Sequence, residues 1–201
     1  MPNRFKPSIE EVNAFVAATV AITAAFTAFK GNITVRSVVF YGAVSGLILL
    51  SREIGQRTIA QWMEADVELK LSPEGTVLTL LGAGMSFLSS IPVIMLFPIT
   101  SNFSITSYEH WGKGVDAMWI KREQWFVNAG LVALSILWLG FYSLGISNGA
   151  EAVSFFALFQ LLPFDYSGIP TGRLDGAVIL KHNGFRWILW FALAWISVVP
   201  L

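Results

Sequence analysis

A short element at positions 172–178 is well suited to chemistry. It contains two glycines and Asp175, and it lies in the apolar C-terminal third of the chain. An ionisable side chain at membrane depth is destabilising by roughly 2.5–3.5 kcal/mol on insertion scales, so such a residue marks a functional site by default. Its partner is expected on another span, in a segment that contains Arg52, Glu53 and Gln56 but no histidine. These four side chains are the first candidates for a site within the membrane.

The composition is that of a membrane protein. Of the 201 residues, 55% are hydrophobic and only 13% are charged, whereas about a quarter of residues are charged in soluble domains. The formal net charge is zero, which gives no indication of a nucleic-acid partner. The absence of cysteine excludes disulfides, iron–sulfur clusters and cysteine-ligated zinc. We therefore expect an all-α, polytopic integral protein of the cell membrane, with residues 1–201 forming a single transmembrane domain.

Six apolar segments predict six transmembrane spans, one of them broken. The first lacks a convincing cleavage site and is expected to remain as an uncleaved span. An alternation of apolar and polar residues over 65–74 predicts a short strand or hairpin edge, and a polar loop is expected over 98–124. The predicted spans are residues 12–29, 38–62, 76–97, 125–144, the broken span 151–181, and 185–201.

The fifth span is expected to be broken in its middle. Its first part, 151–162, has about 12 residues and is too short to cross a bilayer. Residues 163–172 contain two prolines and two glycines, which end the helix, and a second half-helix is expected over 174–181. Irregular backbone at membrane depth is tolerated only where it is buried in protein or lines a polar cavity. We therefore expect this segment in the interior of the protein.

The distribution of lysine and arginine predicts the orientation. Positive loops are retained on the cytoplasmic side, and the side with more lysine and arginine does not carry the termini, so both termini are expected outside. Two glycosylation sequons, at Asn32 and Asn102, would then lie on the inner side, and they disagree with this orientation. The basic residues of one side are Lys30, Arg36, Lys113, Lys121, Arg122, Lys181 and Arg186, against Arg4, Lys6 and Lys70 on the other.

Two elements make the chain resemble the site-2 protease family of intramembrane zinc metalloproteases. That family carries His-Glu-x-x-His on one span, and Asn-x-x-Pro and Leu-Asp-Gly on a later broken span. Here Gln160 to Pro163 is similar to the Asn-x-x-Pro element, and Leu174 to Gly176 matches the Leu-Asp-Gly element. The resemblance covers residues 37–183 as a protease-like core, with 12–29 and 185–201 as flanking spans.

In the family, the two histidines and the aspartate hold zinc, and the glutamate activates the metal-bound water. At the corresponding positions this chain has Arg52 and Gln56 in place of the histidines and Gln160 in place of the asparagine, while Glu53 and Asp175 remain in register. Arginine offers no lone pair to a metal. Without zinc, water keeps its high pKa and Glu53 has nothing acidic to deprotonate. We therefore expect no metal, no other cofactor and no catalytic residue.

Arg52 is expected to replace the metal as counter-charge, by bridging Asp175 or Glu53 bidentately across two spans. The same reasoning predicts a second pair between Arg173 and Asp165. An alternative partner for Glu53 is the arginine four residues later on the same helix face. Hydrolysis by Glu53 and Asp175 alone, as in aspartic proteases, is disfavoured because the arginine favours the charged form of both carboxylates.

The expected function is that of a pseudoprotease: an accessory membrane subunit that acts as a scaffold in the structure or assembly of a larger complex. Its expected partners are other integral membrane subunits and lipids, with a membrane oxidoreductase or monooxygenase as a candidate complex. One alternative is an active intramembrane metalloprotease with unusual ligands, such as His110, His182 and Asp175. Another is a lipid-binding membrane module that uses the former active-site cavity between the second and fifth spans.

Overall fold

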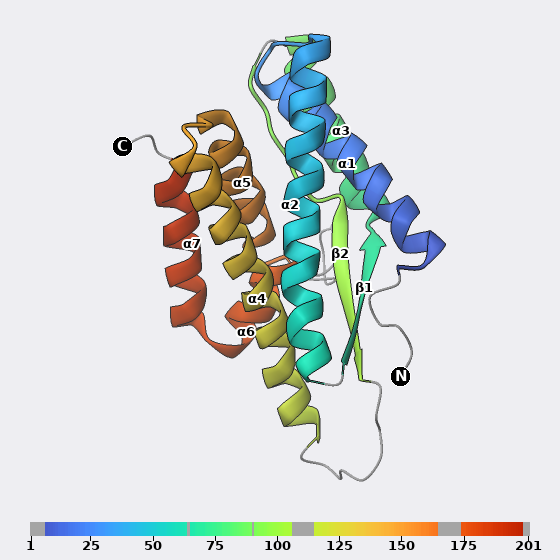
Figure 1. Cartoon of the computed structure of the whole chain (residues 1–201), viewed down its shortest axis with the longest axis vertical. Coiled ribbons are helices and arrows are strands. Elements are labelled where there is room, and N and C mark those ends of the chain that lie inside the picture. The colour runs from blue at the N-terminus through green and yellow to red at the C-terminus, as the bar shows by residue number, and fades with distance from the viewer. Residues whose placement is uncertain (1–6, 64, 90, 106–114, 165–173, 199–201) are drawn as a thin grey trace.

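The computed structural model describes residues 7–63, 65–89, 91–105, 115–164 and 174–198, which are mostly helical. In the view of Figure 1, the long helix α2 stands in the middle, with α1, α3 and a pair of strands to one side of it and α4, α5, α6 and α7 to the other. In chain order the elements are α1 (Ile9–Phe29), α2 (Val35–Trp62), β1 (Ala65–Leu71), α3 (Pro73–Ser89), β2 (Ile99–Ile105), α4 (Val115–Ser143), α5 (Ser147–Gln160), α6 (Asp175–His182) and α7 (Gly184–Val198).

Among the residues that the structure describes, three helices are long and apolar enough to cross a membrane: α1, α2 and the part of α4 from Glu123 to Ser143. The other helices that coincide with predicted full-length spans are shorter. α3 has 17 residues and α7 has 15, against the roughly 20 that span a typical hydrocarbon core. The described part of the chain is thus a mostly helical protein with three helices of spanning length, and the six-span arrangement stays a prediction.

The third predicted span, 76–97, is wrong beyond Ser89, where α3 ends. The following segment, 91–98, is not helical and folds back along α3. Ser86 Oγ donates to the carbonyl of Val93 at 2.6 Å and accepts from its N–H at 2.7 Å, while Thr79 Oγ1 accepts from the N–H of Phe97 at 3.0 Å. The small residues of α3 accommodate the returning backbone.

The two strands form an antiparallel pair that runs from Ala65 opposite Ile105 to Leu71 opposite Ile99. β1 confirms the first part of the strand predicted over 65–74, whose last two residues belong to α3. β2 lies within the predicted polar loop 98–124, and α4 begins inside it as well, at Val115. That loop prediction is wrong because the residues after 98 continue the return of the chain and pair with β1. This pairing brings β2 close to α2.

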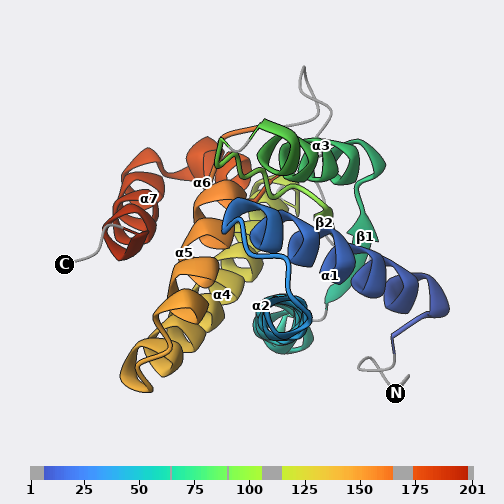
Figure 2. The same ribbon diagram turned by 90° about the horizontal axis from the view of Figure 1, so that it is seen from above.

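α2 packs closely against α4 and β1, and is seen nearly end-on in Figure 2. Its crossing with α4 is tight at Gly55, where an added Cβ would lie 2.6 Å from the carbonyl oxygen of Ala129. Any larger residue at position 55 would force the two helices apart. The glycine therefore sets the distance between α2, which carries Arg52 and Gln56, and α4, which covers them.

The predicted broken span appears as two separate helices, α5 and α6. α5 begins at Ser147, four residues before the predicted start. Most of the predicted irregular segment 163–172 lies outside the described residues. The start of α6 lies against the end of α5, because the N–H of Leu174 donates to the carbonyl of Phe164 at 3.1 Å.

Candidate functional site

A buried ion pair joins α2 to α6. Arg52 is 1% exposed and Asp175 is 4% exposed. Nη2 of Arg52 lies 2.7 Å from Oδ1 and 2.9 Å from Oδ2 of Asp175, and Nε lies 3.1 Å from Oδ2. Both carboxylate oxygens are therefore bound by one guanidinium, in the fork geometry that makes arginine–carboxylate pairs strong.

The second terminal nitrogen of Arg52 is bound by β2. Nη1 donates to Ser101 Oγ at 2.8 Å, and this hydroxyl donates in turn to Gln56 Oε1 at 2.9 Å. The chain of hydrogen bonds joins α6, α2 and β2, and returns to α2 one turn further on. Ser101 lies in the segment that the sequence predicts as a loop, and no feature of its own marked it as a site residue.

α4 closes the site from the remaining side at Gly130. A Cβ at this position would lie 3.1 Å from Gln56 Nε2 and 3.3 Å from Arg52 Cγ. The glycine lets the α4 backbone approach the two polar side chains closely. Arg52 and Gln56 are consequently almost inaccessible to solvent, at 1% and 0% exposure.

A second buried network lies beside the first, on the side of α2 that faces α1. Arg57 Nε donates to Glu53 Oε1 at 2.6 Å, and its Nη2 forms an ion pair with Glu11 of α1. Glu11 also accepts a hydrogen bond from the N–H of Leu69 in β1, at 3.2 Å. This network ties α1, α2 and β1 together. Glu53 is thus paired with Arg57, the alternative that helical spacing offers.

Glu11 was not among the predicted site residues. It also completes a capping box with Ser8: Glu11 N–H donates to Ser8 Oγ at 3.1 Å, and Ser8 N–H donates to Glu11 Oε2 at 2.9 Å. A serine followed three residues later by glutamate is a helix-start signal that can be found in a sequence. The signal identifies the cap, but not the ion pair with a distant arginine.

The remaining predicted site residues lie around the end of α5. Gln160 is 1% exposed, and within the described part of the chain neither atom of its side-chain amide has a hydrogen-bond partner. Pro163 follows in non-helical backbone. Gly176 stands next to Asp175 in the first turn of α6, where it contacts the end of α5. The other predicted pair, Arg173 with Asp165, lies outside the described residues.

The donor set does not fit the zinc that the family resemblance implies. Both oxygens of Asp175 are bound by a guanidinium, and Gln56 Oε1 accepts from Ser101. Among the described residues there is no group of three or more histidine, aspartate or glutamate side chains placed to hold a metal ion. His182 ends α6, at the opposite end from Asp175, and His110 lies outside the described residues.

The arrangement can hold helices together, because the contacts of Arg52 join α2 to α6 and β2, and those of Glu11 join α1 to α2 and β1. Buried charges that are paired and hydrogen-bonded impose one specific packing, since a shifted helix would leave a charge without its partner. No family model, curated protein or solved structure matches this chain.

Proposed function

We propose that this chain is a non-catalytic member of the site-2 protease-like family, which serves as a structural or assembly subunit of a larger membrane complex. The observation that carries the proposal is the bidentate pair of Arg52 with Asp175. The resemblance places a zinc histidine at position 52 and a zinc aspartate at position 175. By this resemblance, the guanidinium of Arg52 takes the place of the family's metal, and it neutralises the negative charge of Asp175 as the metal does.

The site chemistry supports a structural role over hydrolysis. A catalytic zinc site needs three protein ligands and an open position for water. Here the arginine is buried and engages both oxygens of Asp175, while Arg57 engages Glu53. Both oxygens of Asp175 are thereby occupied, and Glu53, with one oxygen bound by Arg57, has no metal-bound water to deprotonate. The contacts serve instead to fasten α6, β2 and α1 to α2.

The outer faces of the helices support a role among other membrane components. Many large apolar side chains are exposed on the described helices, and such surfaces face lipid or other subunits in a membrane protein. Examples lie on four helices: Val20 on α1, Phe87 on α3, Ile136 on α4 and Leu193 on α7. We propose other integral subunits as partners, with a membrane oxidoreductase or monooxygenase as a candidate complex and both termini outside.

The proposal is tested by purifying the full-length chain from native membranes under mild conditions, followed by mass spectrometry and metal analysis. A scaffold subunit should travel with the same membrane proteins in fixed ratio and carry less than stoichiometric zinc. Arg52→Ala should lower the yield of that assembly, and the exposed-face variant Lys70→Ala serves as the control. Stoichiometric zinc together with cleavage of a transmembrane peptide would overturn the proposal in favour of an active protease.

A further inference from the structure

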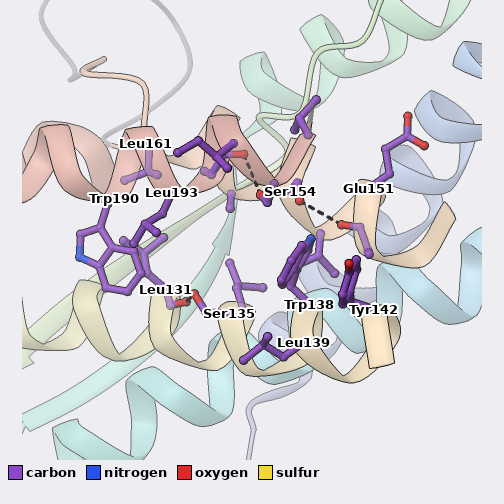
Figure 3. Close-up of a pocket in the computed structure, with 18 of the residues that line it drawn as sticks. Leu131, Ser135, Trp138, Leu139, Tyr142, Glu151, Ser154, Leu161, Trp190 and Leu193 are labelled. Carbon is purple, nitrogen blue, oxygen red and sulfur yellow. Dashed lines mark hydrogen bonds between the residues drawn. The ribbon is translucent and has the colours of Figure 1, made fainter. Parts of the chain in front are cut away.

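A groove of about 800 Å³ lies between α4, α5 and α7 (Figure 3). Its walls are mainly apolar. Trp138 and Leu139 of α4 face it together with Ala157 of α5 and Trp190 and Leu193 of α7. Sites that hold small organic molecules usually have volumes of about 300–1,000 Å³. The groove therefore has the size of a ligand site.

An acyl chain suits the apolar lining and the length of this groove. An α-helix rises 1.5 Å per residue. The wall formed by α5 runs from Ser147 to Leu161, about 21 Å at this rise, which exceeds the ~15 Å of one hydrocarbon leaflet.

Polarity changes along the groove. One end is apolar, with Leu131, Leu161 and Trp190. The other end holds Ser147 and Glu151, and it lies where α4 has just ended and α5 begins. Helices of spanning length end near the membrane surface, so this polar end is expected at the level of the lipid headgroups.

A pair of opposite charges stands at the polar end. Lys30, the C-cap of α1, lies with Nζ 2.6 Å from Oε2 of Glu151, and both side chains are about 30% exposed. A paired cation and carboxylate at the rim are complementary to a headgroup that contains a phosphate and a primary amine. The phosphate would contact Lys30 and the amine would donate to Glu151.

We infer that the groove binds one phospholipid with a zwitterionic, primary-amine headgroup, with an acyl chain along α5 and the headgroup at the pair of Lys30 and Glu151. The carboxylate of Glu151 selects for the amine because a quaternary ammonium has no N–H to donate. This inference does not rest on the proposed assembly role, since Lys30 and Glu151 take no part in the hydrogen bonds around Arg52.

The test is native mass spectrometry of the purified, delipidated full-length chain, titrated with phosphatidylethanolamine, phosphatidylcholine or phosphatidylglycerol. We expect one phosphatidylethanolamine per chain, bound about tenfold more tightly than phosphatidylcholine. This factor corresponds to ~1.4 kcal/mol, which one charge-assisted hydrogen bond to Glu151 can supply. Glu151→Gln should remove the preference between these two lipids and leave binding of the acyl chain.

Two neighbouring positions on α4 separate the groove from the general lipid-facing surface. Ser135 lines the groove, whereas Ile136 is 66% exposed and does not. Ser135→Trp should fill the groove and abolish retention of the lipid, while Ile136→Trp should retain it. Equal retention by both variants, or equal affinity for all three lipids, would overturn the inference and indicate only annular lipid. Release of a co-purified helix by Ser135→Trp would overturn it in favour of a protein partner.

Discussion

The α-carbon of Gly176 lies against the carbonyl of Leu161, so closely that an added Cβ would be 2.0 Å from the carbonyl oxygen. Because Gly176 directly follows Asp175, this contact fixes the start of α6 against the end of α5 and with it the position of the buried aspartate. The glycine of the Leu-Asp-Gly element thus has a packing role of its own, independent of any metal.

Gly176→Ala should therefore be strongly destabilising, by about 2–3 kcal/mol or more, because the methyl group overlaps backbone that cannot rotate away. Thermal unfolding of the purified protein in detergent measures the effect. Gly84→Ala is the matched control, since nothing lies within 4 Å of a Cβ at that position of α3. Alanine favours a helix interior over glycine, so this control should be neutral or slightly stabilising. Similar losses for both variants would contradict the close approach of α6 to α5.

Asp175→Ala should lower the free energy of unfolding by about 3–5 kcal/mol, because it leaves the guanidinium of Arg52 buried without a counter-charge. Arg52→Met should lower the free energy of unfolding by a similar amount, because it leaves the carboxylate of Asp175 buried without a counter-charge. The combination of Arg52→Met with Asp175→Leu should recover part of the loss, since replacing both charges by apolar groups removes the unpaired charge. A double-mutant cycle measures the coupling.

An exposed pair provides the reference for this cycle. Lys70 and Glu68 lie 3.1 Å apart on β1, with about half of each side chain exposed. Removal of either should change stability by no more than about 0.5 kcal/mol, as for most surface positions. Additive losses for Arg52 and Asp175, without coupling, would show that the two charges do not depend on each other.

The pairing of Arg52 with Asp175 follows from the sequence because a charge at membrane depth needs a partner, and few candidates exist in the apolar segments. The positions of α1 and α2 can also be predicted from the sequence, because an apolar run of this length indicates a helix. The second partner of Arg52 cannot be predicted from the sequence. Ser101 is brought to this arginine by the pairing of β2 with β1, and a seven-residue strand within a polar stretch has no distinctive period.

The return of the chain along α3 shows the same limit. Glycine and serine at spacings of three and four residues permit the close approach of any backbone, whether helical or extended. Gly82 and Ser86 therefore indicate a contact face but not its occupant, which is the segment 91–98. Glu11 is a similar case, because its position in the first turn of α1 accounts fully for its presence, and only the tertiary structure reveals its pairing with Arg57.

Glu11→Ala should destabilise the protein by about 2–4 kcal/mol, because the change removes a capping-box residue and leaves Arg57 with one carboxylate in place of two. Hydrogen exchange should show the largest loss of protection in the first turns of α1 and along β1, where Leu69 donates to Glu11. Glu10→Ala is the control on the same helical turn, since Glu10 is exposed. Matching exchange profiles for the two variants would contradict a role for Glu11 in joining α1 to α2.

Restoring the missing histidines tests whether the scaffold still has the geometry of the zinc site that the family resemblance implies. Arg52→His together with Gln56→His would rebuild the His-Glu-x-x-His element and free both oxygens of Asp175. Two histidines and an aspartate form a three-ligand site with an open position, so we expect about one zinc per chain by mass spectrometry of the metal, against background for the unmodified protein. Adding Asp175→Asn to the pair should reduce zinc retention at least tenfold, which distinguishes this site from histidines that bind zinc at the surface. If the double variant folds and retains no zinc, α2 and α6 do not have the arrangement of a zinc protease, and the proposed kinship with that family loses its support.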